Sequence, residues 1–123
     1  MRVRAAILKQ SGLSYPYAQS KPLHIETITL APPDPDEVLV RIAAAGLCHS
    51  DLSVINGDRP RPTPLALGHE ASAIVEECGS HVTDLRRGDH VVMSFVPTCG
   101  HCAMCIDGRA ALCEPGNLAN GQG

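Results

Sequence analysis

Four cysteines crowd into fifteen residues of this sequence, and their spacing limits what the chain can fold into. They follow the pattern C-x2-C-x2-C-x7-C and are Cys99, Cys102, Cys105 and Cys113. Four thiolates at such a spacing can close around one tetrahedral zinc ion of the structural kind, which leaves no open coordination position. Gly100 and Gly108 add the backbone freedom that such a loop requires. The pattern therefore predicts a zinc-stapled cysteine lobe over residues 97–115.

Two alternatives to a zinc site stay open for the four cysteines. They could be buried or disulfide-bonded thiols, although closely spaced cysteines in a reducing compartment are more often metal ligands. They could also hold an iron–sulfur cluster, whose bacterial pattern C-x2-C-x2-C-x3-C-P opens with the same spacings. Here the fourth cysteine follows seven residues and precedes Glu114 instead of proline. His101 adjoins Cys102 and is expected to face solvent, because neighbours rarely point at the same ion.

Length and composition exclude several classes of protein. The chain has 123 residues, which suits one domain, and its net charge of −3 is mixed along the sequence. With two Tyr, one Phe and no basic stripe, nucleic acid is a poor partner. No stretch approaches the ~18 apolar residues of a membrane span, and the apolar run 5–8 is too short for a secretory signal. These features predict a cytoplasmic protein without nucleic-acid or membrane partners.

Short strands with proline-bearing loops between them dominate the remaining pattern. Apolar residues alternate over 2–9 and again over 38–44, as in strands with one buried face. Further strands are expected over 23–30, 71–78 and 91–96, and the only helix expected before the cysteines runs from Ser50 to Ile55. Residues 59–64 alternate with proline and should be extended. Residues 114–123 carry neither pattern and are expected to form a loop. The sequence thus predicts a mainly β domain, a barrel or a sandwich.

A second group of chemistry-bearing residues lies upstream in two short motifs. Gly46-Leu47-Cys48-His49-Ser50-Asp51 places a cysteine at a strand end, and Gly68-His69-Glu70 places a histidine at the head of another strand. Taken alone, the cysteine reads as a small buried hydrophobe and the histidine as an ordinary core or surface residue. Together they could supply a thiolate, an imidazole and supporting carboxylates to a metal.

In these three motifs, and in their order, the sequence resembles the zinc-dependent medium-chain alcohol dehydrogenases, in their N-terminal GroES-like catalytic domain. The resemblance runs over nearly the whole chain. It implies a GroES-like, partly open β-barrel with short helices and a zinc-stapled cysteine lobe. Residues 1–123 would be a truncated catalytic domain, because no G-x-G-x-x-G is present and the nucleotide-binding domain would lie outside this sequence.

The resemblance also implies two zinc sites. Cys48 and His69 correspond to two of the three protein ligands of the catalytic zinc, and the third lies beyond residue 123 in the family. Asp51 would orient the imidazole of His69, and Glu70 corresponds to a carboxylate near the metal. The four-cysteine lobe corresponds to the structural zinc site.

Other residues would act on substrate and cofactor. Ser50 corresponds to the hydroxyl that contacts the substrate oxygen and begins the proton relay, and His49 to a residue that reaches the cofactor pyrophosphate. Phe95 is similar to a wall residue of the substrate pocket. The sequence departs from some members of the family at Ser53, where they have a histidine at the outer end of the relay.

The activity that the resemblance implies is zinc-assisted hydride transfer between an alcohol and NAD or NADP, giving an aldehyde or ketone, or the reverse. The partners would be a small alcohol or aldehyde and, in the intact enzyme, further copies of the same chain. The 123-residue chain alone would be inactive. The alternative is a zinc-stapled, non-catalytic GroES-like interaction module, in which Cys48 and His69 are ordinary buried residues.

Overall fold

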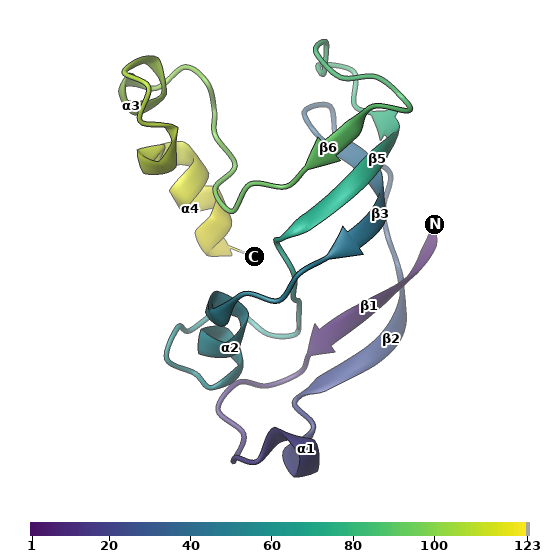
Figure 1. Cartoon of the computed structure of the whole chain (residues 1–123), viewed down its shortest axis with the longest axis vertical. Coiled ribbons are helices and arrows are strands. Elements are labelled where there is room, and N and C mark those ends of the chain that lie inside the picture. The colour runs from purple at the N-terminus through teal and green to yellow at the C-terminus, as the bar shows by residue number, and fades with distance from the viewer. Residues whose placement is uncertain (123) are drawn as a thin grey trace.

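Two three-stranded antiparallel sheets and a helical lobe make up this computed structural model, which describes residues 1–122 (Figure 1). The first sheet has the order β2 (Leu23–Thr29), β1 (Arg2–Leu8), β4 (Leu65–Ala66). Along its centre Arg2 lies opposite Thr29 and Leu8 opposite Leu23. The alternation in the sequence of β1 fits this pairing, because it turns one face of the strand toward the interior, where Ile7 is buried.

The second sheet has the order β3 (Val38–Ala45), β5 (Ala71–Cys78), β6 (His90–Val92). The strands β3 and β5 pair from Val38 opposite Cys78 to Ala45 opposite Ala71, with two irregularities along the way. The predicted strand over 91–96 is too long, because β5 begins at Ala71 and offers no partner to residues after Met93, whose N–H bonds to the Ala71 carbonyl. The mainly β fold class is confirmed.

The buried apolar core is small and sits where the first sheet meets helix α2 (His49–Ile55). Leu8, Val54 and Ile55 form its centre, and Tyr17 with Leu65 packs against it. Helix α2 begins one residue before the expected Ser50, since Cys48 occupies the N-cap position. Residues 59–64 form neither helix nor strand, in keeping with the expected extended segment.

Two short elements contradict the expectations for the first half of the chain. Helix α1 (Tyr17–Ser20) lies before the cysteines in addition to α2, although only a single helix was expected in that part of the chain. Strand β4 adds two residues that were not expected to form a strand. A single turn such as α1 is too short to show helical periodicity in a sequence. It ends at Lys21, which has a left-handed φ of 45° and donates its N–H to the Tyr17 carbonyl.

The cysteine lobe contains the short helix α3 (Ala103–Ile106) and the 3-10 turn η1 (Ala110–Leu112). Helix α4 (Glu114–Gln122) begins at the end of the lobe and is the largest error of the sequence-based prediction, because a loop was expected there. Two Gly, one Pro and two Asn in α4 are poor helix formers. Tertiary contacts hold it instead: a Cβ on Gly116 would come within 1.8 Å of the Pro97 carbonyl oxygen, and Asn120 Nδ2 donates to the Phe95 carbonyl at 3.2 Å.

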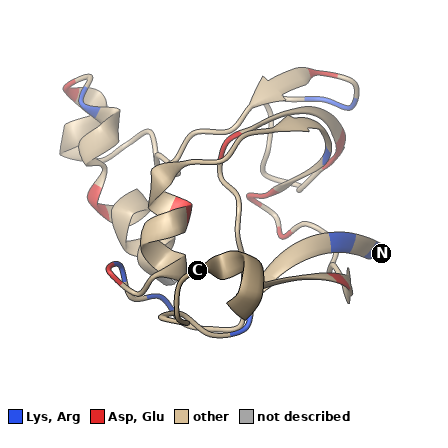
Figure 2. Ribbon diagram, turned by 60° about the horizontal axis from the view of Figure 1, so that its bottom comes forward, with Lys and Arg blue, Asp and Glu red and all other residues tan. Residues whose placement is uncertain are grey.

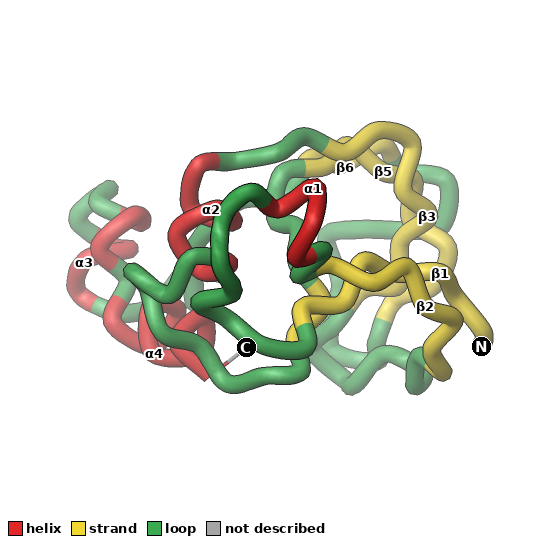
Figure 3. Tube along the Cα trace, turned by 90° about the horizontal axis from the view of Figure 1, so that it is seen from below, coloured by secondary structure: helices red, strands yellow, loops and turns green. Residues whose placement is uncertain are grey.

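The lobe and α2 gather on one side of the molecule, and the two sheets on the other (Figure 3). Residues of both charge signs are scattered along loops, strands and helices (Figure 2). Within residues 1–122, every helix is too short or too polar to cross a lipid bilayer.

Replacing Gly116 by Ala should destabilise the protein by about 1–3 kcal/mol, because the added methyl must displace the Pro97 backbone. Urea unfolding followed by circular dichroism measures this change. The matched control is Gly121→Ala in the same helix, where the nearest atom, Arg61 Nη1, lies 3.8 Å from the added Cβ. That control should gain about 0.5–1 kcal/mol from helix propensity. Equal effects at the two positions would contradict the close packing of α4.

Candidate functional site

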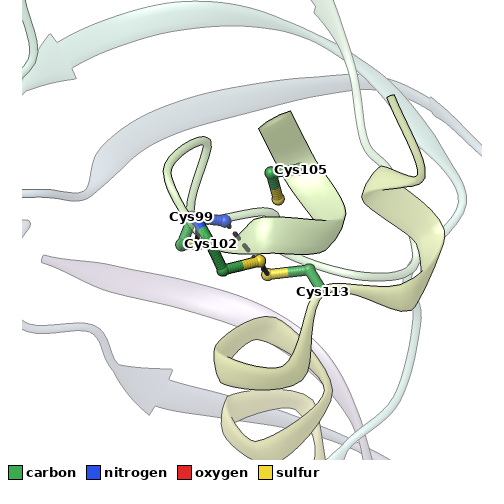
Figure 4. Close-up of side chains that lie close together, drawn as sticks. All are labelled: Cys99, Cys102, Cys105 and Cys113. Carbon is green, nitrogen blue, oxygen red and sulfur yellow. Dashed lines mark hydrogen bonds between the residues drawn. The ribbon is translucent and has the colours of Figure 1, made fainter. Parts of the chain in front are cut away.

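The four lobe cysteines point into one small volume (Figure 4). Their sulfur atoms all lie within 4.8 Å of one another. Cys102 caps α3 and Cys105 lies in it, Cys99 precedes it, and Cys113 lies between η1 and α4. Gly100 and Gly108, with φ of 78° and 75°, allow the turns that bring the four together, as the sequence suggested.

Backbone N–H groups point at the sulfur atoms. The Cys113 sulfur accepts from the N–H groups of Cys99 and Gly116, both at 3.3 Å, and the Cys99 sulfur accepts from Cys102 N–H at the same distance. Cys113 is fully buried. Hydrogen bonds of this kind stabilise a thiolate over a thiol. The donor set of four sulfurs therefore fits a closed tetrahedral zinc site.

Two of the thiols have strongly shifted pKa values, in opposite directions. A hydrogen bond from the His101 backbone lowers the pKa of the Cys99 thiol to about 6. Burial raises the pKa of the Cys105 thiol to about 12, and the neighbouring cysteines add to this rise. The four sulfurs do not carry four charges together unless a cation joins them. The His101 side chain is exposed, as predicted.

A second group forms where β3 ends and β5 begins. The antiparallel pairing of Ala45 with Ala71 carries the chain past Gly46, whose N–H donates to the Glu70 carbonyl at 2.8 Å. Cys48 therefore follows β3 and His69 precedes β5, at the same end of two paired strands. Ligand atoms of Cys48, His69 and Glu70 lie within 4.8 Å of one another. Thiolate, imidazole and carboxylate are all zinc ligands, so this donor set also fits the metal.

Asp51 is buried beneath this group and joins α2 to His69. One carboxylate oxygen accepts the Cys48 N–H at 3.1 Å, and the other lies 3.3 Å from His69 Nδ1. It is the only charged side chain buried among residues 1–122, with 8% of its surface exposed. Two partners for a carboxylate offset the cost of its burial. Asp51 thereby fixes the ring of His69, with Nε2 facing away from the carboxylate.

Ser50 lies on the other side of the His69 ring. Its Oγ is 3.1 Å from Nε2, so consecutive residues of α2 contact both ring nitrogens. His49, the residue expected to reach the cofactor, is exposed at the start of the same helix. Ser53 donates its hydroxyl to the His49 carbonyl at 3.2 Å, which occupies the hydroxyl within its own helix.

A cleft opens beside Ser50 and His69, and Phe95 lies in its wall. The Phe95 ring meets the His69 ring edge to face, with 4.8 Å between their centroids. The Arg59 guanidinium stacks over Phe95, 5.1 Å from its centroid. Arg59, Arg61 and Asn120 line this cleft and were missed by the sequence analysis. The two arginines lie in the proline-alternating segment, whose pattern indicates a backbone conformation and gives no sign of a charged wall.

Known proteins are similar to this chain over most of its length. The family described as the alcohol dehydrogenase GroES-like domain matches residues 34–123. The chain is 43% identical to the NDMA-dependent alcohol dehydrogenase of Amycolatopsis methanolica over 116 residues, which is 94% of this chain and 29% of that protein. The chain thus spans less than a third of the length of such curated relatives.

Solved structures have a similar fold. Benzyl alcohol dehydrogenase from Acinetobacter calcoaceticus superposes with a TM-score of 0.85 at 36% identity, covering 100% of this chain and 32% of that one. A cobalt- and zinc-bound thermostable alcohol dehydrogenase from Pyrobaculum aerophilum gives 0.80 at 33% identity, covering 94% and 33%.

Replacing Asp51 by Ala should lower the free energy of unfolding by about 0.5–2 kcal/mol, because the first turn of α2 loses the acceptor for the Cys48 N–H. Urea titration of the two proteins measures the difference. The control is Asp84→Ala, an exposed aspartate without an ion pair among the described residues. The idea that Asp51 anchors α2 fails if both variants unfold at the wild-type urea concentration.

Proposed function

Because the chain belongs to the alcohol dehydrogenase GroES-like domain family, we propose that it is the metal-binding part of an oxidoreductase that interconverts alcohols with aldehydes or ketones, using NAD or NADP. The observation that carries the proposal is the group of Cys48, His69 and Glu70, whose ligand atoms lie within 4.8 Å of one another beside a cleft. A non-catalytic interaction module would not explain why a set of metal ligands lies next to Ser50 and Asp51.

In this proposal the protein holds two zinc ions with different tasks. The four lobe cysteines would hold a structural ion, since four sulfurs are a complete ligand set for tetrahedral zinc. Cys48 and His69 hold the catalytic ion, and Glu70 is the carboxylate within reach of it. Two cysteine-containing clusters suit a reducing compartment, so the proposal includes a cytoplasmic location. It also includes assembly into homo-oligomers, which the family resemblance implies.

Zinc, when bound at Cys48 and His69, supplies Lewis acidity toward an alcohol or carbonyl oxygen, and the nicotinamide supplies the hydride acceptor or donor. The residues of this chain do the rest. Ser50 Oγ lies beside His69 Nε2 at 3.1 Å, which places its hydroxyl where it can accept the alcohol proton. Asp51 keeps the His69 ring in the orientation that turns Nε2 toward the cleft.

Phe95 supports this arrangement from the cleft side, where its ring packs edge to face on His69. His49 is exposed at the N-terminal end of α2, so its ring is free to meet the phosphates of the dinucleotide. The Ser53 hydroxyl donates to the His49 carbonyl at 3.2 Å, so position 53 supplies no imidazole to carry the proton onward from Ser50.

The zinc content of cysteine variants tests the two-site arrangement. The complete protein should carry about two zinc ions per chain by metal mass spectrometry, and Cys48→Ser should carry about one and lose turnover of a primary alcohol. Cys78→Ser is the matched control, since Cys78 lies outside both clusters and donates to the Leu85 carbonyl. Wild-type zinc content and turnover in Cys48→Ser would overturn the assignment.

Replacing Ser50 by Ala should slow alcohol oxidation by about 10²–10⁴-fold, the usual contribution of a group that transfers a proton. Its zinc content should match that of wild type, because the hydroxyl acts on the proton. Steady-state kinetics over a range of pH, together with metal analysis, separates the two effects. Ser80→Ala, at an exposed position after β5, is the control. Ser50 has no part in proton transfer if its variant turns over like the control.

A further inference from the structure

Two arginines line the cleft next to the candidate catalytic residues. Arg59 and Arg61 are both half-buried, and they share the cleft with Ser50 and His69. Neither arginine makes an ion pair with any residue of the described segment 1–122. Two cations without an anionic partner in one cleft make that cleft attractive to an anion supplied from outside these residues.

Contacts on both sides hold the two guanidinium groups at the cleft. The Arg59 guanidinium carbon lies 5.1 Å from the centroid of the Phe95 ring, and the centroids of the Phe95 and His69 rings are 4.8 Å apart. Phe95 therefore contacts both the guanidinium and the imidazole. Arg61 donates one N–H to the Gly121 carbonyl of α4 at 3.3 Å, which leaves its other donors unused. A guanidinium stacked on an aromatic ring keeps its edge N–H groups available for a carboxylate.

The carboxylates of the site do not neutralise these arginines. Asp51 is engaged by His69 and by the Cys48 N–H. Glu70 also lines the cleft near Arg59, but it lies within ligand distance of Cys48 and His69. Leu65 and Leu67 also line the cleft and add apolar surface to it. The cleft lining therefore combines Ser50 and His69 with apolar side chains and two positive charges.

We propose that the substrate of this site is an alcohol or aldehyde that carries a carboxylate or a similar anionic group, and that Arg59, assisted by Arg61, binds that group. The inference rests on the proposed function and specifies its substrate class. A phosphate of the dinucleotide is the other possible source of an anion, and the test distinguishes it from the substrate. The apolar residues Leu65 and Leu67 favour the substrate as the source of the anion, because a carbon chain can pack on them and a pyrophosphate cannot.

The test compares alcohols that differ only in charge. ω-Hydroxy carboxylates of about four to eight carbons are paired with primary alcohols of equal length, and kcat/KM is measured for the complete protein, expressed with zinc. Flexible chains let the carboxylate reach the arginines at whichever length fits. We expect the best hydroxy acid to exceed its neutral partner by about 10- to 100-fold, the usual worth of a hydrogen-bonded charge pair.

Arg59→Gln should reduce this preference by at least about 10-fold, and Arg59→Lys should restore part of it. Loss of the stacking on Phe95 slows both alcohols alike and leaves the ratio unchanged. Arg4→Gln, an exposed arginine of β1 away from the cleft, is the control and should keep the wild-type ratio. The KM for the dinucleotide should not change in any of the variants.

Binding of hexanoate gives a readout that does not depend on turnover. Calorimetry should show that hexanoate binds wild type and the Arg4→Gln control alike, and that Arg59→Gln weakens the binding about 10-fold or more. Turnover without preference for hydroxy acids, or a KM change confined to the dinucleotide, overturns the substrate assignment and leaves the proposed function intact. If no alcohol turns over, the proposed function fails, and hexanoate binding still decides whether Arg59 binds a carboxylate.

Discussion

The buried carboxylate of Asp51 is the contact on which the candidate site depends. It lies in the first turn of α2, accepts the Cys48 N–H and contacts His69, which comes from the start of β5. A buried charge is costly without partners, so the structure around it is restricted to arrangements that supply both contacts. One side chain thus ties the helix that carries Ser50 to the strand that follows His69, and the relative position of the two is fixed.

The apolar core around this contact is small, and the cysteine lobe is held together by other contacts. Seven apolar residues are buried within the described part of the chain, among them Cys113, which lies in the lobe away from the Leu8 cluster. The lobe is organised by N–H groups that point at sulfur atoms and by the seating of Gly116 on Pro97. Its cohesion therefore depends on four sulfurs being held together, which is the task that a metal ion performs in small domains.

Helix α4 connects this lobe to the cleft. Asn120 donates to the Phe95 carbonyl, and the Gly121 carbonyl accepts from Arg61. The wall of the cleft that carries Phe95 and Arg61 is thus attached to a helix that begins directly after Cys113. Two hydrogen bonds therefore join the cysteine lobe, through α4, to the wall of the cleft.

Local features of the fold could be predicted because they depend on neighbours in the sequence. Alternation predicted β1 and β3 to within a residue, and the cysteine spacing predicted that four sulfurs could meet. The motif around Cys48 predicted which polar groups stand together on α2. In each case, residues of one type recur at a spacing that is set by the local geometry of a helix, strand or loop.

The rest was decided by contacts between distant segments. A sequence with two glycines and a proline gives little reason to expect α4, which forms because Gly116 fits against Pro97 and Asn120 reaches Phe95. Likewise, Ser50 meets His69 across 19 residues, and Arg59 meets Phe95 because strand pairing and the lobe fold them together. The sequence by itself determined which groups are available for chemistry, through local spacing. Only the tertiary structure decided which groups face one cleft, because that depends on packing between segments that no local pattern records.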